Sequence, residues 1–356
     1  MSVPFGALTS FDKLDVPCLD FQVYGNPTSS TTIFLVAGWP DNQSVFRNNL
    51  VNLLENCLDD NNGEGYRVVG ISMPGYQHKR PEGSTHFTTV GTTYKPSEAV
   101  QELINATPSV NSIKTPFLGY PLLTVAKMLQ KTMYFAMTLC ETERTAAGLG
   151  AQKRPILVGH DWGSIISQEM LLSHPFFFDR VVLIDVGNSA SLGKYPEDGN
   201  ILKRKLFYLF YQSFIMITSF LLPNILSRKL LSIFTTKGQR PAYKDVNSGK
   251  PVVANWTMAW MYLRVYYEMV TGTGMKSLKK PLTPSIPMMF LYSSPIAHMR
   301  FHSTAFLKVL EERAKVDGKS KVVVVRGGHW FFARPDAKYD SERQHIMDFI
   351  RDGNKK

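Results

Sequence analysis

The stretch that decides the fold is Ile156-Leu-Val-Gly-His-Asp-Trp-Gly-Ser-Ile-Ile166. Its first residues form the apolar run of a short buried strand, and residues 165–172 follow with helical spacing. Between them, glycines stand two residues before and two residues after Asp161. This spacing predicts a tight strand-to-helix turn whose central side chain is exposed on a strained backbone, with room for neighbouring chain to approach.

Asp161 occupies the position that a serine nucleophile holds in turns of this kind. A carboxylate is already ionised near neutral pH, so it needs no base to activate it. If it attacked carbon by displacement it would form an alkyl ester, which a histidine would hydrolyse by activating water. Taken alone, the motif also fits a helix that begins with Asp as its N-cap.

Apolar runs and helical patterns alternate on both sides of this turn. Buried strands are predicted at 33–36, 66–72, 155–158, 180–184, 287–292 and 321–325, and helices at 45–58, 122–149 and 165–172. Alternation of this type predicts an α/β fold: a mostly parallel sheet with helices on both faces. Functional groups are then expected at the carboxyl ends of the strands.

Two stretches interrupt the alternation. Residues 77–118 are polar and contain one short helical pattern near 97–104, which predicts an inserted loop. Residues 187–280 contain several helical patterns and no convincing strand, which predicts a helical cap inserted in the sheet. The chain is therefore divided into a first core segment, 1–186, the cap, 187–280, and a second core segment, 281–356.

Composition narrows the classes of function. The chain has 356 residues, 44% of them hydrophobic, which is enough for a globular core. Its formal net charge of +11 suits an anionic partner, but the cations are scattered and no nucleic-acid motif is present, so we expect no nucleic-acid binding.

The three widely spaced cysteines, Cys18, Cys57 and Cys140, predict neither a disulfide framework nor a metal site. With no secretory signal visible, a reducing, cytoplasmic location is expected.

A histidine follows the last predicted strand, in the run Val322-Val-Val-Val-Arg-Gly-Gly-His329. The two glycines permit a tight turn that would bring His329 beside Asp161. None of the other seven histidines has this glycine-flanked setting at a strand end. His329 is therefore the candidate general base, with an unremarkable loop histidine as the alternative.

The segments Gly159-His-Asp-Trp-Gly-Ser164, Gly38-Trp-Pro40 and Met73-Pro-Gly-Tyr76 together resemble the epoxide hydrolase and haloalkane dehalogenase branch of the α/β-hydrolase family. The resemblance spans nearly the whole chain, apart from the insertion at 77–118, and implies an α/β-hydrolase fold with a cap. It also implies that the backbone N–H groups of Trp39 and Trp162 form an oxyanion hole. One supporting side chain is missing, because Ala37 stands where the family pattern has histidine. The Gly-Trp-Pro turn is a candidate for a cis proline.

The third catalytic group is harder to place. Related hydrolases commonly carry an Asp or Glu after the penultimate strand, but residues 288–299 contain no carboxylate. Some dehalogenases place this acid after the strand that follows the elbow, where the present chain has Asp185. Asp185 is therefore a candidate for orienting His329. Because an Asp is common at that strand end, a structural role is the alternative.

Resembling enzymes use cap tyrosines to donate hydrogen bonds to the epoxide oxygen. The segment 255–267 looks like the family's tyrosine-bearing helix, and it suggests Tyr262 as the acid, with Tyr266 and Trp260 contacting substrate. Tyr195 or Tyr208 would supply a second phenol. Aromatic residues at helical spacing also fit simple packing.

Residues 206–222 carry no charge and are flanked by Lys203-Arg-Lys205 and by Arg228-Lys229. A spanning helix needs about 20 apolar residues, and this run contains four polar ones, so we expect a packed cap helix. Peripheral membrane contact by an amphipathic helix is the alternative.

The residues and the resemblance together predict a hydrolase that opens a small lipophilic epoxide with water and uses no cofactor or metal. The alternatives are a haloalkane dehalogenase-like hydrolase, and a catalytically impaired binding protein with the same fold. The sequence leaves the oligomeric state open.

Overall fold

The structure is a computed structural model that describes residues 15–57, 63–76, 96–106, 119–237, 240–275, 280–283, 285–293 and 300–351. The described strands form one seven-stranded sheet in the order β1-β3-β2-β4-β5-β6-β7. They are β1 Phe21–Gly25, β2 Thr32–Val36, β3 Arg67–Ile71, β4 Ile156–His160, β5 Arg180–Ile184, β6 Met288–Tyr292 and β7 Lys321–Val324. All neighbours pair in parallel except β1, which is antiparallel to β3. The predicted α/β fold class is confirmed.

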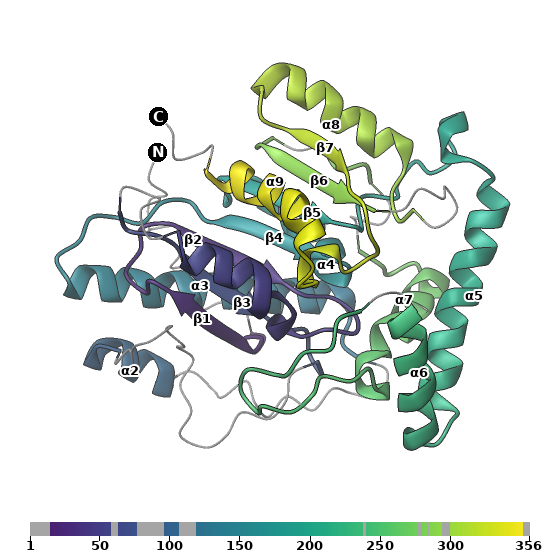
Figure 1. The fold of residues 1–356 in the computed structure, drawn as a ribbon, viewed down its shortest axis with the longest axis horizontal. Coiled ribbons are helices and arrows are strands. Elements are labelled where there is room, and N and C mark those ends of the chain that lie inside the picture. Colours follow the sequence, from purple (N-terminus) through teal and green to yellow (C-terminus); the bar gives the residue numbers. More distant parts are fainter. Residues whose placement is uncertain are drawn as a thin grey trace.

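Strands β2 to β6 are buried along their whole length, as expected when helices cover both faces of a parallel sheet. The core helices are α1 Asn52–Glu55, α2 Glu98–Ala106, α3 Leu122–Ala146, α4 Trp162–Ser173, α8 Thr304–Asp317 and α9 Asp340–Arg351. Helical turns from Gln43 to Val51 lead into α1. In Figure 1, α9 lies in front of the sheet and α3 lies behind it. Apolar side chains from both faces form one buried core.

Three helices lie between β5 and β6 in the chain: α5 Ile201–Phe220, α6 Asn224–Lys237 and α7 Trp260–Thr271. The Asn200 side chain caps the start of α5, Pro223 precedes α6, and Gly272 ends α7 in the left-handed conformation. Figure 1 shows the three helices grouped together, beyond the carboxyl ends of the parallel strands. Within the described residues, the stretch 187–280 therefore contains the predicted helices, whereas the domain boundaries stay predictions.

The predicted insertion at 77–118 lies only partly within the residues that the structure describes. Helix α2 matches the helical pattern expected near 97–104. The rest of the predicted inserted loop, at 77–95 and 107–118, lies outside the described residues.

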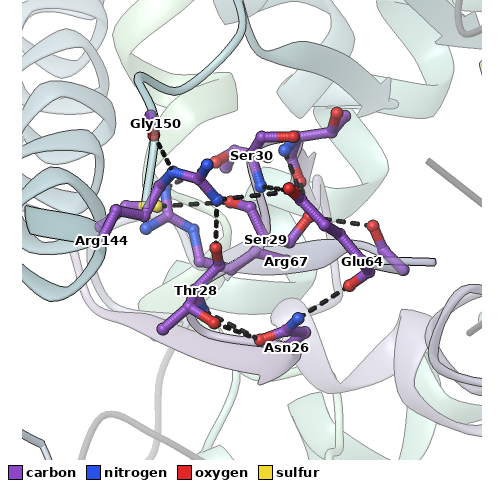
Figure 2. Close-up of polar contacts among 12 residues, drawn as sticks. Asn26, Thr28, Ser29, Ser30, Glu64, Arg67, Arg144 and Gly150 are labelled. Atoms are coloured by element: carbon purple, nitrogen blue, oxygen red, sulfur yellow. Dashed lines mark hydrogen bonds and ion pairs between the residues drawn. The ribbon is translucent and has the colours of Figure 1, made fainter. Parts of the chain in front are cut away.

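A network of polar contacts holds together the loops that precede β2 and β3 (Figure 2). Arg144, near the end of α3, donates to the carbonyls of Thr28 and Gly150 and lies 3.4 Å from the Glu64 carboxylate. Glu64 also accepts the Ser30 N–H at 2.6 Å. Because these loops enter the amino ends of parallel strands, the network fixes the edge of the sheet opposite the one that carries the candidate site.

Candidate active site

Asp161 stands in a tight turn between β4 and α4, with φ 52° and ψ −122°. A positive φ is strained for a residue with a side chain, and such strain is typical of the elbow that exposes a nucleophile. The turn also needs its glycines. A Cβ on Gly163 would lie 2.1 Å from the Val36 carbonyl oxygen, and one on Gly159 would lie 2.9 Å from the Ser164 Cα. Asp161 occupies the N-cap position of α4 but makes no side-chain capping bond, so helix capping does not explain this residue.

The Asp161 carboxylate is held by backbone donors from two segments. Its Oδ2 accepts the Trp39 N–H at 2.7 Å, and the Trp162 N–H also hydrogen-bonds to the carboxylate. The loop that carries Trp39 can come this close only because it contains Gly38, where a Cβ would lie 2.6 Å from Asp161 Oδ2 and 2.3 Å from the Trp162 nitrogen. The Trp39–Pro40 peptide bond is cis, which confirms that prediction.

His329 lies between two carboxylates. Its Nδ1 is 2.5 Å from Asp185 Oδ2, and its Nε2 is 3.7 Å from Asp161 Oδ1. The loop reaches this position through Gly327, whose φ of 112° favours glycine and where a Cβ would lie 2.6 Å from the Tyr339 ring. With Nδ1–H donating to Asp185, Nε2 is directed towards Asp161.

Asp185 follows β5 directly and is buried. Its Oδ1 accepts hydrogen bonds from the backbone N–H and the hydroxyl of Ser293, each at 3.2 Å. Ser293 follows β6, the strand end where related hydrolases commonly carry the acid. In this protein that strand end supplies a donor that holds the carboxylate of the neighbouring strand.

Burial and charge together shift the pKa values of the three groups. Burial raises the pKa of Asp161 to about 6, although the charge of His329 and the backbone N–H bonds lower it. Burial also acts against ionised Asp185, but the charge and hydrogen bond of His329 lower the pKa of Asp185 to about 2. For His329, burial lowers the pKa, whereas the charges of Asp185 and Asp161 raise it to about 9. Near neutral pH the site therefore holds two carboxylates and an imidazolium between them.

Two phenols from the inserted helices lie at this site. The hydroxyls of Tyr262, in α7, and Tyr211, in α5, are 3.1 Å apart. The Tyr262 ring packs edge-on against Trp39 and Trp162, the residues whose N–H groups hold Asp161, at centroid distances of 5.6 and 5.4 Å. Burial, with the nearby charge of Asp161, raises the pKa of both phenols, so both keep their protons at neutral pH.

The predicted partners of Tyr262 lie elsewhere. The Tyr208 hydroxyl donates to the Arg300 carbonyl, and the Tyr195 ring lies 3.9 Å from the Lys308 ammonium nitrogen. Sequence reasoning missed Tyr211. Its signal was the spacing of Tyr208, Tyr211 and Ile215 along α5, which is the period of one helix face.

Trp260 and Tyr266, predicted to contact substrate, have packing partners. The Trp260 indole donates to the Pro74 carbonyl at 2.9 Å and covers Gly119, where a Cβ would lie 2.1 Å from the ring. The Tyr266 hydroxyl lies 3.5 Å from the Leu209 carbonyl of α5. These contacts fasten α7 to its neighbours, and a role in substrate binding stays a prediction for both residues.

A buried carboxylate that no sequence pattern indicated joins three parts of the site. Asp41, directly after Pro40, accepts hydrogen bonds from Arg240 Nε and the Tyr243 hydroxyl, each at 2.7 Å, and from Trp330 Nε1 at 2.5 Å. Arg240 and Tyr243 belong to the stretch between α6 and α7, and Trp330 follows His329. Asp41 therefore ties the Trp39 loop to both the stretch between α6 and α7 and the loop that carries His329.

Among the described residues, no group of three or more His, Cys, Asp or Glu side chains is arranged to hold a metal ion.

Comparison with known sequences gives the family. A sequence model of the α/β hydrolase fold matches residues 31–231, more than half of the chain. The protein therefore belongs to the α/β hydrolase fold family and is an α/β-hydrolase. A search of curated proteins found no significant match.

Solved structures with a similar fold cover most of the chain at low identity. A marine microorganism esterase is 12% identical, with a TM-score of 0.47, and covers 94% of this chain and 99% of its own. A thermophilic esterase from Thermogutta terrifontis is 11% identical, with a TM-score of 0.45 and coverages of 94% and 93%. The epoxide hydrolase CorEH is 14% identical, with a TM-score of 0.41 and coverages of 93% and 93%. Identities this low carry no substrate over to the present protein.

Proposed function

We propose that this hydrolase opens a lipophilic epoxide to a diol through a covalent ester on Asp161, which water activated by His329 then hydrolyses. The observation that carries the proposal is the arrangement around one carboxylate. Asp161 Oδ2 accepts the Trp39 N–H, Oδ1 faces His329 Nε2, and His329 in turn contacts Asp185. This is the geometry of a nucleophile, a base and an orienting acid, with aspartate as the nucleophile.

In the first step, Asp161 Oδ1 attacks an epoxide carbon and the carbon–oxygen bond of the ring breaks. The departing alkoxide takes a proton from the phenol pair. Each phenol has one proton to donate, so when one hydroxyl donates to the other across the 3.1 Å contact, the second proton is free for the substrate. Their raised pKa values keep Tyr262 and Tyr211 in the protonated form that this step requires.

In the second step, Oδ2 is the carbonyl oxygen of the ester. His329 Nε2 takes a proton from water, and the hydroxide attacks Asp161 Cγ. Negative charge then develops on Oδ2, where the Trp39 N–H is already in place, and the Trp162 N–H also hydrogen-bonds to this carboxylate, so the two N–H groups would serve as the oxyanion hole. The tetrahedral intermediate expels the diol oxygen, which takes the proton from His329. The new Asp161 carboxyl group then gives up its remaining proton, which restores the phenol consumed in the first step, and Asp161 regains a carboxylate that contains one oxygen from water.

The charge balance prepares His329 for this role. Before the reaction, the negative charge of Asp161 contributes to the raised pKa of His329. Ester formation removes that charge, so the pKa of His329 falls and the imidazole becomes available as a base. Asp185 keeps its charge and continues to hold the ring in the orientation that directs Nε2 towards the ester.

A second reaction is favoured by one observation. The indole N–H of Trp39 is buried and has no hydrogen-bond partner within the described part of the chain. An unpaired N–H donor on the residue whose backbone holds Asp161 suits a departing halide, which would make the protein a haloalkane dehalogenase-like hydrolase. The Tyr262 and Tyr211 pair favours the epoxide, because an alkoxide needs a proton and a halide does not.

Intact-mass spectrometry with peptide mapping tests the proposal. His329→Gln protein is incubated with a panel of lipophilic epoxides and alkyl halides, beside wild type, Asp161→Asn and the matched control His174→Gln. We expect an epoxide adduct on Asp161 that accumulates only in His329→Gln. An adduct formed with halides alone would support the dehalogenase reaction. The absence of any adduct across the panel would contradict both reactions and favour a binding protein.

A further inference from the structure

Helix α5 presents different side chains on its two faces. The inner face carries Tyr211 of the candidate site and the buried residues Arg204 and Ile215. The outer face is apolar and solvent-exposed, with Phe210 72% and Leu206 55% exposed. The stretch 206–222, predicted to be a packed cap helix, therefore packs along one side only. The uncovered side is the one that an amphipathic interfacial helix would use.

The apolar surface extends over the neighbouring helices. A short turn joins α5 to α6, and Phe214 packs against Phe234 with ring centroids 5.4 Å apart. Helix α7 runs antiparallel to α5, because Tyr262 contacts Tyr211 and Tyr266 contacts Leu209. Figure 1 shows the three helices side by side at one end of the molecule. We name as the outer face the exposed apolar residues Leu202, Leu206, Leu209, Phe210, Ile217, Leu221, Ile225, Leu226, Ile233, Met269 and Val270.

The charges around the outer face are all positive on α5 and α6. Residues 201–237 contain six Lys or Arg residues and no Asp or Glu. Of these, Lys203 and Lys205 are exposed near the start of α5, and Arg228 and Lys229 are exposed on α6, near the other end of α5. Cations therefore flank the apolar surface at both ends.

An exposed apolar face flanked by cations favours one kind of binding partner. No helix in the described residues is long and apolar enough to cross a membrane. A second copy docked through the same face would bring these cations against their own counterparts across a twofold axis, which is unfavourable. We propose that the outer face binds an anionic lipid surface, with its apolar side chains in the interface and its cations against the headgroups.

Lipid binding would place the candidate site close to the bilayer. Tyr211 lies on the opposite side of the same helix, and a helix with its side chains is only about 10 Å across. A lipophilic substrate dissolved in the membrane would then have a short path to Asp161. This consequence rests on the proposed function, whereas the lipid binding itself does not.

Vesicle co-sedimentation tests the proposal without any turnover measurement. The full-length protein is mixed with phosphatidylcholine vesicles, with or without phosphatidylserine. Phe210→Ser/Leu206→Ser removes part of the apolar surface, and Lys203→Gln/Lys205→Gln removes two cations. Phe176→Ser/Val316→Ser is the matched control, because both residues are exposed apolar side chains outside α5, α6 and α7, 66% and 78% exposed.

We expect wild type to bind the phosphatidylserine vesicles and to be released by salt. The serine pair should lower partitioning at least tenfold, since two large side chains no longer leave water. The glutamine pair should lower it about fivefold for each charge removed. The control should match wild type. Absence of binding to phosphatidylserine vesicles, or an equal loss in the control, would overturn the proposal. A dimer in sedimentation velocity that Phe210→Ser abolishes would overturn it in favour of a second copy.

Discussion

Replacing Asp185 by asparagine should slow hydrolysis of the ester while leaving its formation much less affected. The pKa of Asp185 lies at about 2, against an ordinary value of 3.8, chiefly because of its contact with His329. At 1.36 kcal/mol for each pKa unit, this difference is about 2 kcal/mol, or about 30-fold in rate. Asparagine also allows the wrong tautomer of His329, so the whole loss should lie between about 30-fold and about 10⁴-fold.

Rapid-quench kinetics with an epoxide that the enzyme turns over would separate the two steps, because the adduct on Asp161 can be counted by mass. Asp185→Asn should accumulate the adduct. Ser293, whose hydroxyl lies 3.2 Å from Asp185 Oδ1, offers a matched rescue. Ser293→Asp in the Asp185→Asn background returns a carboxylate to the same place and should recover part of the rate. Unchanged hydrolysis in Asp185→Asn would refute the orienting role of Asp185.

Four further predictions test other parts of the site. Tyr262→Phe and Tyr211→Phe should each slow adduct formation at least tenfold, and the double variant about 10²-fold or more. Tyr267→Phe, at an exposed position, is the control and should have no effect. Rapid-quench rates equal to wild type would contradict the role of the two phenols as proton donors. Gly38→Ala should slow ester hydrolysis at least about 10²-fold, because the new Cβ would lie 2.6 Å from Asp161 Oδ2. A hydrolysis rate close to wild type would contradict the need for glycine at this position. Adduct formation should be lost as the pH falls through about 6, because Asp161, with its raised pKa, becomes protonated in that range and no longer acts as a nucleophile. If the single-turnover rate instead falls with a midpoint near the ordinary value of 3.8, the pKa shift is contradicted. Asp41→Asn should lower the free energy of unfolding in urea by about 3 kcal/mol, because it leaves the Arg240 charge buried without its ion pair. An unchanged urea midpoint would contradict a stabilising role for the Asp41–Arg240 ion pair.

The sequence was most informative where neighbours along the chain determine the structure. The run 156–172 contains a β-branched strand, two glycines and a helix, and each signal is complete within a few residues. The two glycines before His329 are another local signal, because they mark the end of a predicted strand and so predict where His329 lies in the sheet. The fold class and the meeting of Asp161 with His329 follow from such local signals and from the parallel order of the strands.

Contacts between distant segments could not be predicted from the sequence. Asp41 meets partners about 200 and 289 residues further along the chain, and no pattern near Asp41 marks them. Tyr211 pairs with Tyr262 only because α5 and α7 pack against each other. Helix periodicity could place Tyr211 on an inner face, but it could not choose among the tyrosines of that face. Residues 288–299 contain no carboxylate, and no pattern near Ser293 shows that its hydroxyl hydrogen-bonds to Asp185, which follows the neighbouring strand.

The most direct test of the covalent ester is a single turnover of an epoxide in H₂¹⁸O with enzyme in excess, followed by mass analysis of the diol and of the peptide that contains Asp161. If the ester forms and water attacks Asp161 Cγ, the diol of this first turnover contains only unlabelled oxygen, and the Asp161 peptide gains one ¹⁸O. If water attacks the epoxide directly, the label appears in the diol at once and Asp161 stays unlabelled, which would contradict the mechanism proposed for this site.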